Sequence, residues 1–259
     1  VLKKGQIIFE GRDLMELSER EMRDIRGREI SMVFQNSMAS LNPVKTIGKQ
    51  ITEVLEKRMG MDRRNARLRA IELIESVGIS DPERQLGRFP MNLSGGMLQR
   101  ISIAIALAAE PKLLIADEPT TSLDVTIQAQ ILELLRRQQI ERKMALILVT
   151  HDLGIVSNYA DHIVVMYAGQ IVENCATSSL IRRPRMPYTK ALMNSAPRLS
   201  DPPHTRLSAI AGMPPDPLTV RPGCRFNDRC PYVMDQCRQT TRTTRLNLVG
   251  NLLAGRHKT

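Results

Sequence analysis

Two neighbouring acidic residues, Asp117 and Glu118, end an apolar run that begins at Leu113 and is typical of a buried strand. Ligands bind at the carboxyl ends of strands in a parallel sheet, so both carboxylates are candidates for chemistry. In phosphoryl transfer, one carboxylate holds Mg²⁺ while a second orients or deprotonates the attacking water. Taken alone, however, the pair is explained equally well as the solvated end of a strand.

A second candidate lies at the start of an expected helix, where Ser94 is a natural N-cap before the apolar residues 101–109. Gly95 and Gly96 lack the Cβ that would keep a phosphate away from the N–H groups of the first turn. An ordinary capped helix is the alternative, but it has no need of two glycines that each cost about 1 kcal/mol relative to Ala. The pattern therefore favours an anion site.

The elements that must position these residues follow from the apolar pattern, which predicts an α/β fold with a largely parallel sheet. The buried strands are expected at residues 30–34, 113–117, 145–150 and 162–167. A helical subdomain is expected over about 45–110, with Leu68, Ile71 and Ile74 on one apolar face and Gly78 as a C-cap. Ten of the fifteen prolines fall within residues 184–231, so an irregular extension is expected over 196–259.

Composition limits the classes of function. The chain has 259 residues, 42% of them apolar, which is enough for a sizeable core. Its longest uninterrupted apolar run, 103–109, is far shorter than the roughly 20 residues that cross a bilayer. Most of the net charge of +10 lies after residue 195, and only four Phe, four Tyr and no Trp are present. This distribution argues against nucleic-acid binding and favours a basic tail near anionic lipid or an acidic partner.

The octet from Leu93 to Arg100 resembles the signature motif of ABC ATPases, and further motifs of that family occur in order. The resemblance implies an ABC-type P-loop ATPase core over residues 1–195, with ATP and Mg²⁺ as cofactors. It also implies site residues: Gln35, Glu118 and His151 as catalytic residues; Ser94, Gly95, Gly96, Gln99 and Asp124 as nucleotide-binding residues; and Asp117 with Gln35 as Mg²⁺ ligands. We expect two such subunits to dimerise head to tail.

Other segments resemble the oligopeptide and dipeptide importer branch of that family: 40–44, 117–130, 166–169, 187–192 and 223–226. This resemblance implies a second ATPase subunit, two transmembrane permease subunits and a periplasmic or lipid-anchored peptide-binding protein as partners. It places the chain at the cytoplasmic face of a bacterial inner membrane as a peripheral protein. The alternatives are a transporter of another solute such as nickel, an inert or degenerate fragment, and an ATPase acting on DNA or ribosomes. The last would need coiled-coil arms or a second ATPase domain.

The sequence departs from the family by lacking its phosphate-binding loop and the upstream aromatic residue that stacks on adenine. Because that loop wraps the phosphates in backbone N–H groups, no acidic pair can replace it. We interpret the sequence as truncated or mis-started, with a natural degenerate subunit as the alternative. The isolated chain is therefore expected to bind Mg-ATP poorly.

Three cysteines, Cys224, Cys230 and Cys237, resemble the set that ligates an iron–sulfur cluster in some peptide-importer ATPases. The fourth downstream cysteine of that set is missing here. Two alternatives stay open. The three thiolates could hold a cluster with Cys175, His257 or an outside ligand as the fourth ligand, or they could be reduced, unliganded thiols.

Overall fold

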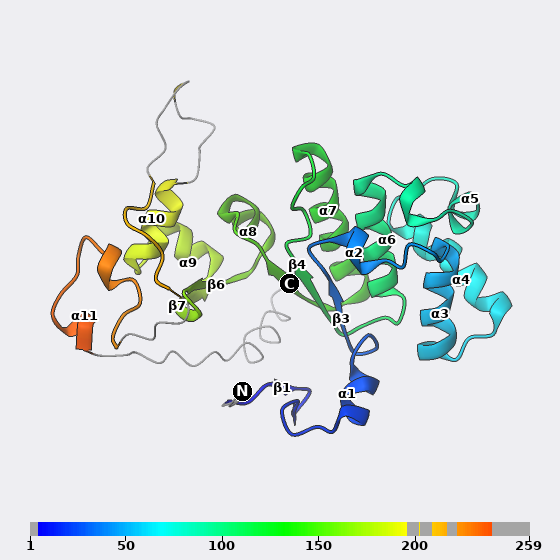
Figure 1. The fold of residues 1–259 in the computed structure, drawn as a ribbon, viewed down its shortest axis with the longest axis horizontal. Coiled ribbons are helices and arrows are strands. Elements are labelled where there is room, and N and C mark those ends of the chain that lie inside the picture. Colours follow the sequence, from blue (N-terminus) through cyan, green and yellow to red (C-terminus); the bar gives the residue numbers. More distant parts are fainter. Residues whose placement is uncertain (1–4, 196–201, 203–208, 217–221, 240–259) are drawn as a thin grey trace, which may run out of the picture. The chain divides into compact units, whose positions relative to one another are not determined.

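The computed structural model describes residues 5–195, 202, 209–216 and 222–239, and it divides the chain into two compact units, 1–150 and 151–259 (Figure 1). None of the helices in this described part is long and apolar enough to span a membrane. The expected division at residue 195 separates a family core from its extension rather than two compact units, and it stays a prediction.

The first unit is built on a parallel sheet of three strands in the order β3–β4–β5; Figure 1 labels β3 and β4. The strands are β3 (Ile30–Val33), β4 (Leu113–Asp117) and β5 (Ala145–Val149). Val33 pairs with Ala116, and Asp117 pairs with Val149, so all three carboxyl ends meet at one edge. These strands confirm three of the expected runs to within one residue at either end.

The predicted helical subdomain is present between β3 and β4. Its helices are α2 (Ser37–Ser40), α3 (Ile47–Met59), α4 (Arg63–Ser76), α5 (Pro82–Leu86), the 3₁₀ turn η1 (Pro90–Asn92) and α6 (Gly95–Leu107). Helix α6 lies at the centre, since it contacts β3 as well as α2, α3, α4 and α7. Its residues Ile101, Ile103 and Leu107 are fully buried, so α6 joins the subdomain and the sheet into one core.

Helices α3 and α4 are separate because Gly60 ends α3 in the left-handed conformation (φ +66°) and Asp62 then caps α4. One expectation for this subdomain needs correction. Leu68 does not belong to the apolar face, since it is 52% exposed. The buried face of α4 instead uses Ala66, Ala70, Leu73 and Ile74, whose small members allow close packing. Gly78 follows the end of α4 with φ +74°, as expected for a C-cap glycine.

The remaining elements of this unit are a hairpin and a helix that precede β3, and one long helix between β4 and β5. Strands β1 (Ile8–Phe9) and β2 (Arg12–Asp13) form a short antiparallel hairpin, followed by α1 (Glu19–Ile25). A capping box of Ser18 and Glu21 starts α1. Between β4 and β5, the long helix α7 (Val125–Arg142) adds buried leucine and isoleucine side chains to the core.

The second unit contains one antiparallel strand pair, β6 (His162–Tyr167) and β7 (Gln170–Ala176), joined at Ala168 and Gly169. The strand expected at 162–167 is therefore confirmed in its bounds, but its neighbour is antiparallel. Both turn residues have positive φ, +47° and +77°, which is typical of a tight hairpin turn. The other elements are α8 (Leu153–Tyr159), α9 (Thr177–Arg182), α10 (Pro187–Ser195), η2 (Asn227–Arg229) and α11 (Gln236–Gln239).

Three aromatic rings tie this unit together: Tyr167 on β6, Tyr188 on α10 and Phe226 in the C-terminal segment. Their centroids lie 4.6 Å (Tyr167–Tyr188), 5.2 Å (Tyr167–Phe226) and 5.4 Å (Tyr188–Phe226) apart. Arg229 donates a 3.2 Å hydrogen bond to the hydroxyl of Tyr167, and Arg225 donates to the carbonyl of Ala168. The described part of the C-terminal segment is thus fixed mainly by rings and arginines, with little regular structure.

Candidate functional site

Glu118 lies at the carboxyl edge of the parallel sheet, directly after β4, and contacts a residue 83 positions earlier in the chain. Its Oε2 accepts a 2.8 Å hydrogen bond from Nε2 of Gln35, which lies two residues beyond the end of β3. Its backbone N–H donates to the carbonyl of Val149 at the end of β5. The parallel order of the strands therefore brings two predicted catalytic residues into direct contact.

Thr121 makes a second contact to the same carboxylate oxygen, this one from a hydroxyl: its Oγ1 donates to Glu118 Oε2 at 2.8 Å. Sequence reasoning missed this residue. The signal was local: Thr121 N–H also bonds the carbonyl of Glu118, so the chain turns back and places the hydroxyl beside the carboxylate. Two donors on one oxygen fix the direction of the carboxylate, which suits a group that must align or deprotonate a water.

The backbone at Glu118 is unusual because its φ is +44°, in the left-handed region that residues other than glycine seldom adopt. Strained backbone of this kind clusters at functional sites, where the surrounding structure holds it in place. Here the bonds to Val149 and Thr121 on either side maintain the turn. The strained backbone at Glu118 therefore fixes the direction in which its carboxylate points.

Asp117, the last residue of β4, is half-buried beside this cluster. Carboxylate and amide oxygens are the donors that Mg²⁺ prefers, and Mg²⁺ commonly takes only one or two of them from protein. The amide nitrogen of Gln35 faces Glu118, so the carbonyl oxygen of Gln35 is the end suited to a cation. The donor set at this edge therefore fits the Mg²⁺ ligands that were predicted, Asp117 and Gln35.

The predicted anion site at the start of α6 has the expected cap, because Ser94 Oγ accepts a hydrogen bond from the N–H of Met97. Gly95 and Gly96 occupy the first turn. A Cβ on Gly96 would lie 3.0 Å from Cγ2 of Ile127, whereas one on Gly95 would make only ordinary contact, 3.6 Å from Leu123. Packing against α7 is thus a reason for glycine at position 96 that the sequence did not reveal.

Asp124, predicted to bind nucleotide, caps α7 by accepting from the N–H of Ile127 at 3.0 Å. Gln99, from the same predicted set, is 3% exposed, and its carbonyl oxygen accepts from the hydroxyl of Ser37 on α2. Its side chain therefore lies inside the subdomain rather than at the exposed start of α6. Nucleotide contacts by Asp124 and Gln99 stay predictions, and the burial of Gln99 favours a link between α6 and α2.

The remaining predicted residues belong to the second unit. His151 is its first residue and is exposed, and its catalytic role stays a prediction. Cys224, Cys230 and Cys237 are half-buried, and the N–H of Cys224 bonds the carbonyl of Cys237 at 2.7 Å. Among the described residues, however, no three His, Cys, Asp or Glu side chains are grouped so that they could hold a metal ion. The alternative ligand His257 lies outside the described residues, and cluster binding by the cysteines stays a prediction.

Two protein families match the chain. One is described as "ABC transporter" and covers residues 2–121; the other is "Oligopeptide/dipeptide transporter, C-terminal region" and covers residues 172–237. The second family begins in β7 and includes two of the three rings described above, Tyr188 and Phe226.

Curated relatives are similar over most of the chain. The oligopeptide transport ATP-binding protein OppD of Bacillus subtilis is 53% identical over 90% of this chain and 65% of its own length. AppD of the same species is 51% identical over 90% and 71%, and DppD of Escherichia coli, a dipeptide transport ATP-binding protein, is 49% identical over 89% and 70%. The chain thus spans about two thirds of the length of these relatives.

Solved structures show the same architecture. A dimeric ATP-binding cassette in a post-hydrolysis state with ADP and Pi matches with a TM-score of 0.61 and 27% identity, over 67% of this chain and 74% of that one. The cbiO1 protein from Clostridium perfringens, part of an ABC transporter complex, matches with a TM-score of 0.60 and 27% identity, over 69% and 68%.

Proposed function

Because the chain belongs to the family of ATP-binding subunits of oligopeptide and dipeptide ABC transporters, we propose that it supplies ATP hydrolysis to an importer of short peptides. The observation that carries the proposal is the 2.8 Å hydrogen bond between Gln35 and Glu118 at the carboxyl edge of the parallel sheet. This bond joins a carboxylate to an amide whose oxygen is suited to a cation, a pair of groups that supports hydrolysis of a Mg²⁺-bound nucleotide.

In this proposal, two ATPase subunits face each other head to tail. Glu118, directed by Gln35 and Thr121, aligns the attacking water. Mg²⁺ held by Asp117 and the carbonyl oxygen of Gln35 would neutralise charge on the phosphates. The exposed first turn of α6, at Gly95, offers backbone N–H groups to the γ-phosphate bound on the opposite subunit.

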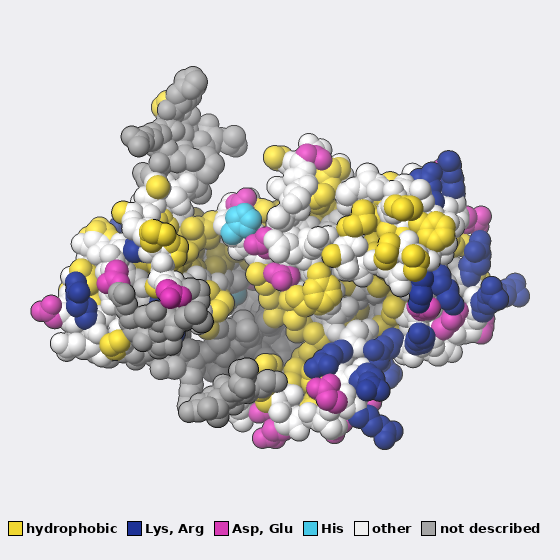
Figure 2. Space-filling model, in the orientation of Figure 1, with side chains coloured by type: hydrophobic (Ala, Val, Ile, Leu, Met, Phe, Trp, Pro, Cys, Tyr) yellow, Lys and Arg dark blue, Asp and Glu magenta, His cyan; other side chains and the backbone are white. Residues whose placement is uncertain are grey.

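Transport also needs contact with membrane partners. Hydrophobic side chains gather on one face of the first unit over α2, α5 and α6 (Figure 2). Exposed large hydrophobic residues close in sequence to α2, α5 and α6 include Phe34, Met38, Val44, Phe89 and Met91. We assign the subdomain and residues 36–44 to contacts with two transmembrane permease subunits, and Gln35 to the link between phosphate and movement. A peptide-binding protein outside the cytoplasm completes the assembly, and this chain is peripheral at the cytoplasmic face.

The test is a Gly95→Asp change in the assembled transporter, because a carboxylate at this position would repel a phosphate and block its approach. A transporter that carries this chain beside an intact ATPase subunit should lose about 10²-fold or more of its ATPase rate, as for loss of a preorganised anion site. Gly11→Asp is the matched control, since Gly11 is exposed in the β1–β2 turn outside the subdomain, and a Cβ there would meet nothing within 4 Å; its positive φ is one that Asp adopts more readily than most residues. Equal rates in the two variants would contradict the proposal.

For the cysteines we propose that Cys224, Cys230 and Cys237 remain thiols or hold only an incomplete, labile cluster. The basis is the missing fourth cysteine downstream of Cys237. Protein purified without oxygen should then contain less than one equivalent of iron and sulfide. A stable complement of about four irons per chain, the content of a [4Fe–4S] cluster, would contradict this.

A further inference from the structure

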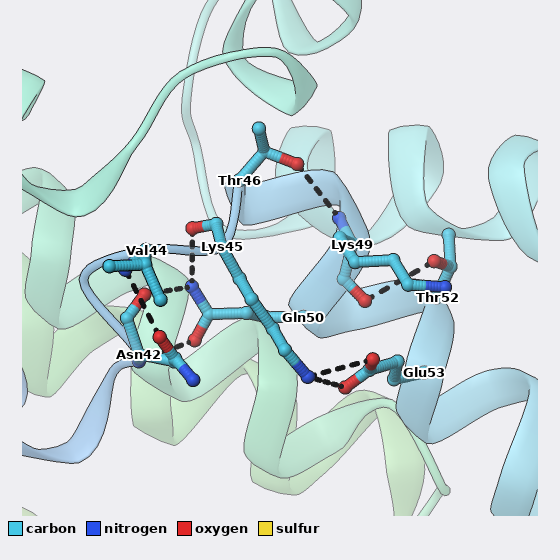
Figure 3. Close-up of polar contacts among 8 residues, drawn as sticks. All are labelled: Asn42, Val44, Lys45, Thr46, Lys49, Gln50, Thr52 and Glu53. Carbon is cyan, nitrogen blue, oxygen red and sulfur yellow. Dashed lines mark hydrogen bonds and ion pairs between the residues drawn. The ribbon is translucent and has the colours of Figure 1, made fainter.

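The loop between α2 and α3 is a tight turn of four residues, Asn42–Pro43–Val44–Lys45 (Figure 3). Asn42 Oδ1 accepts from the N–H of Val44 at 3.0 Å, and the N–H of Lys45 donates to the carbonyl of Asn42 at 3.3 Å. Pro43 sets the backbone at the second position, where proline is favoured. The turn therefore has a defined shape, with Val44 at its apex and 80% exposed.

Gln50, near the start of helix α3, binds the main chain of the Asn42–Lys45 turn. Its Oε1 accepts from the N–H of Asn42 at 2.8 Å. Its Nε2 donates to the carbonyls of Asn42 and Lys45 at 3.0 and 3.1 Å. A primary amide has two N–H donors, so both donors and the carbonyl oxygen of Gln50 are all bound to main-chain groups of the turn.

The base from which Gln50 reaches is itself fixed. Ile47 is fully buried, and its N–H donates to the carbonyl of Arg88 at 2.8 Å. A Cβ on Gly48 would lie 2.9 Å from the carbonyl oxygen of Leu86, so α3 and α5 touch at this point with no room for a side chain. On the other side of the turn, Leu41 is 5% exposed and belongs to the core. The turn is thus clamped between two buried anchors.

We propose that Gln50 is a positioning residue, which holds the Val44 turn in the conformation that docks on a membrane-embedded partner. This inference rests on the proposed function. The apolar apex contributes little burial to the fold, so the polar contacts beneath it serve to present the apex. An ordered turn binds without a further loss of conformational entropy, which is the advantage of preorganisation.

The first arm of the test measures amide hydrogen exchange on the purified full chain. Gln50→Met keeps the length of the side chain but removes all three hydrogen bonds, and the amide of Asn42 should exchange about tenfold faster. Gln50→Glu keeps the acceptor and loses the two donors, so its effect should be smaller at Asn42. Glu53→Gln is the control in this arm. Glu53 pairs with the ammonium of Lys45 at 2.8 Å, and the substitution leaves the main-chain hydrogen bonds of the turn untouched. Unchanged protection of Asn42 in Gln50→Met would overturn the inference.

The second arm uses the assembled transporter in membrane vesicles and measures uptake of a labelled alanine tripeptide per ATP hydrolysed. Gln50→Met should lower this ratio several-fold while its unfolding temperature stays close to that of the original chain, and Val44→Asp should do the same. Glu133→Gln, an exposed carboxylate on α7 outside the subdomain, should leave the ratio unchanged. If Gln50→Met speeds exchange of the Asn42 amide but leaves uptake per ATP hydrolysed unchanged, the positioning role is overturned. Absence of any uptake by the original transporter would instead overturn the proposed function, and the exchange result would still report on the clamp.

Discussion

The carboxyl edge of the parallel sheet and the aromatic cluster of the second unit are both built from segments that carry the family resemblance, yet they differ in kind. At the sheet edge, Gln35, Glu118 and Thr121 bring amide, carboxylate and hydroxyl groups together. In the second unit, the recognisable segments bring together three rings, from β6, α10 and the C-terminal segment. The segments that resemble the family therefore bring polar groups together in one place and packed rings in another, and only the contacts distinguish the two cases.

The largest expected effect tests the packing side of this comparison. Phe226 is 1% exposed and touches both tyrosine rings, so Phe226→Ala should cost about 3–5 kcal/mol in the unfolding free energy of this unit. Tyr232→Ala, at a position 65% exposed, is the control. Limited trypsin digestion with chemical denaturation would measure the change, and cleavage at Arg225 and Arg229 should accelerate in Phe226→Ala alone. Equal stability of the two variants would mean that the cluster does not hold the segment.

The next effect tests the chemical side. In a protein that joins this chain to a phosphate-binding loop, Glu118→Gln should retain ATP binding and slow hydrolysis by about 10² or more, as when a base or water-aligning group is lost. Glu133→Gln, an exposed carboxylate on α7, serves as the control. Single-turnover hydrolysis and calorimetric titration with Mg-ATP separate the two steps. Near-normal turnover in Glu118→Gln would remove this residue from the reaction.

Gly96 lies where chemistry and packing overlap, and a pair of alanine variants separates them. Gly96→Ala should destabilise by about 1 kcal/mol, because crowding against Ile127 outweighs the gain in helix propensity. Gly95→Ala meets only ordinary contact and should be neutral or stabilising by up to about 1 kcal/mol. In an Ile127→Ala background the penalty at position 96 should disappear. Denaturant unfolding measures all of these, and a penalty that persists in that background would point away from Ile127.

The smallest expected effect is that of an ion-pair group at the amino ends of the parallel strands. Glu29 directly precedes β3, and Lys112 directly precedes β4. The Arg12 guanidinium, bound at 3.1 Å, lowers the pKa of Glu29 from its usual 4.5; burial opposes this shift, and the Lys112 ammonium lowers the pKa further. A lowered folded-state pKa adds stability above pH 4.5 that is lost as the pH falls through the folded value. Glu29→Gln should therefore cost less than about 1 kcal/mol at pH 7, and nothing once the carboxyl is protonated. Glu16→Gln is the control, and a difference that grows in acid would contradict this sign.

The sequence predicted the parts of this structure that depend on local signals. Strand β4 has the expected bounds because an apolar run ends in charged residues, and Ser94 caps α6 because a hydroxyl precedes a helical pattern. The burial of Gln99 under α2 and the exposure of Leu68 depend on which helices surround them, and periodicity within one helix does not contain that information. The contact between Gln35 and Glu118 could be expected only from the parallel order of the strands, and Thr121 only from the turn that follows β4.

The separation of 83 residues between Gln35 and Glu118 also determines how long after the first residue the second one is synthesised. At about 5–20 residues per second, a ribosome needs roughly 4 to 17 s to make the chain that separates them. During that interval β3 has been made but its neighbour β4 has not, while the intervening helices can already form through contacts close in sequence. The contact between Gln35 and Glu118 therefore forms only after the helical insertion has been synthesised, so a slow codon within that insertion would lengthen the time that β3 spends unpaired.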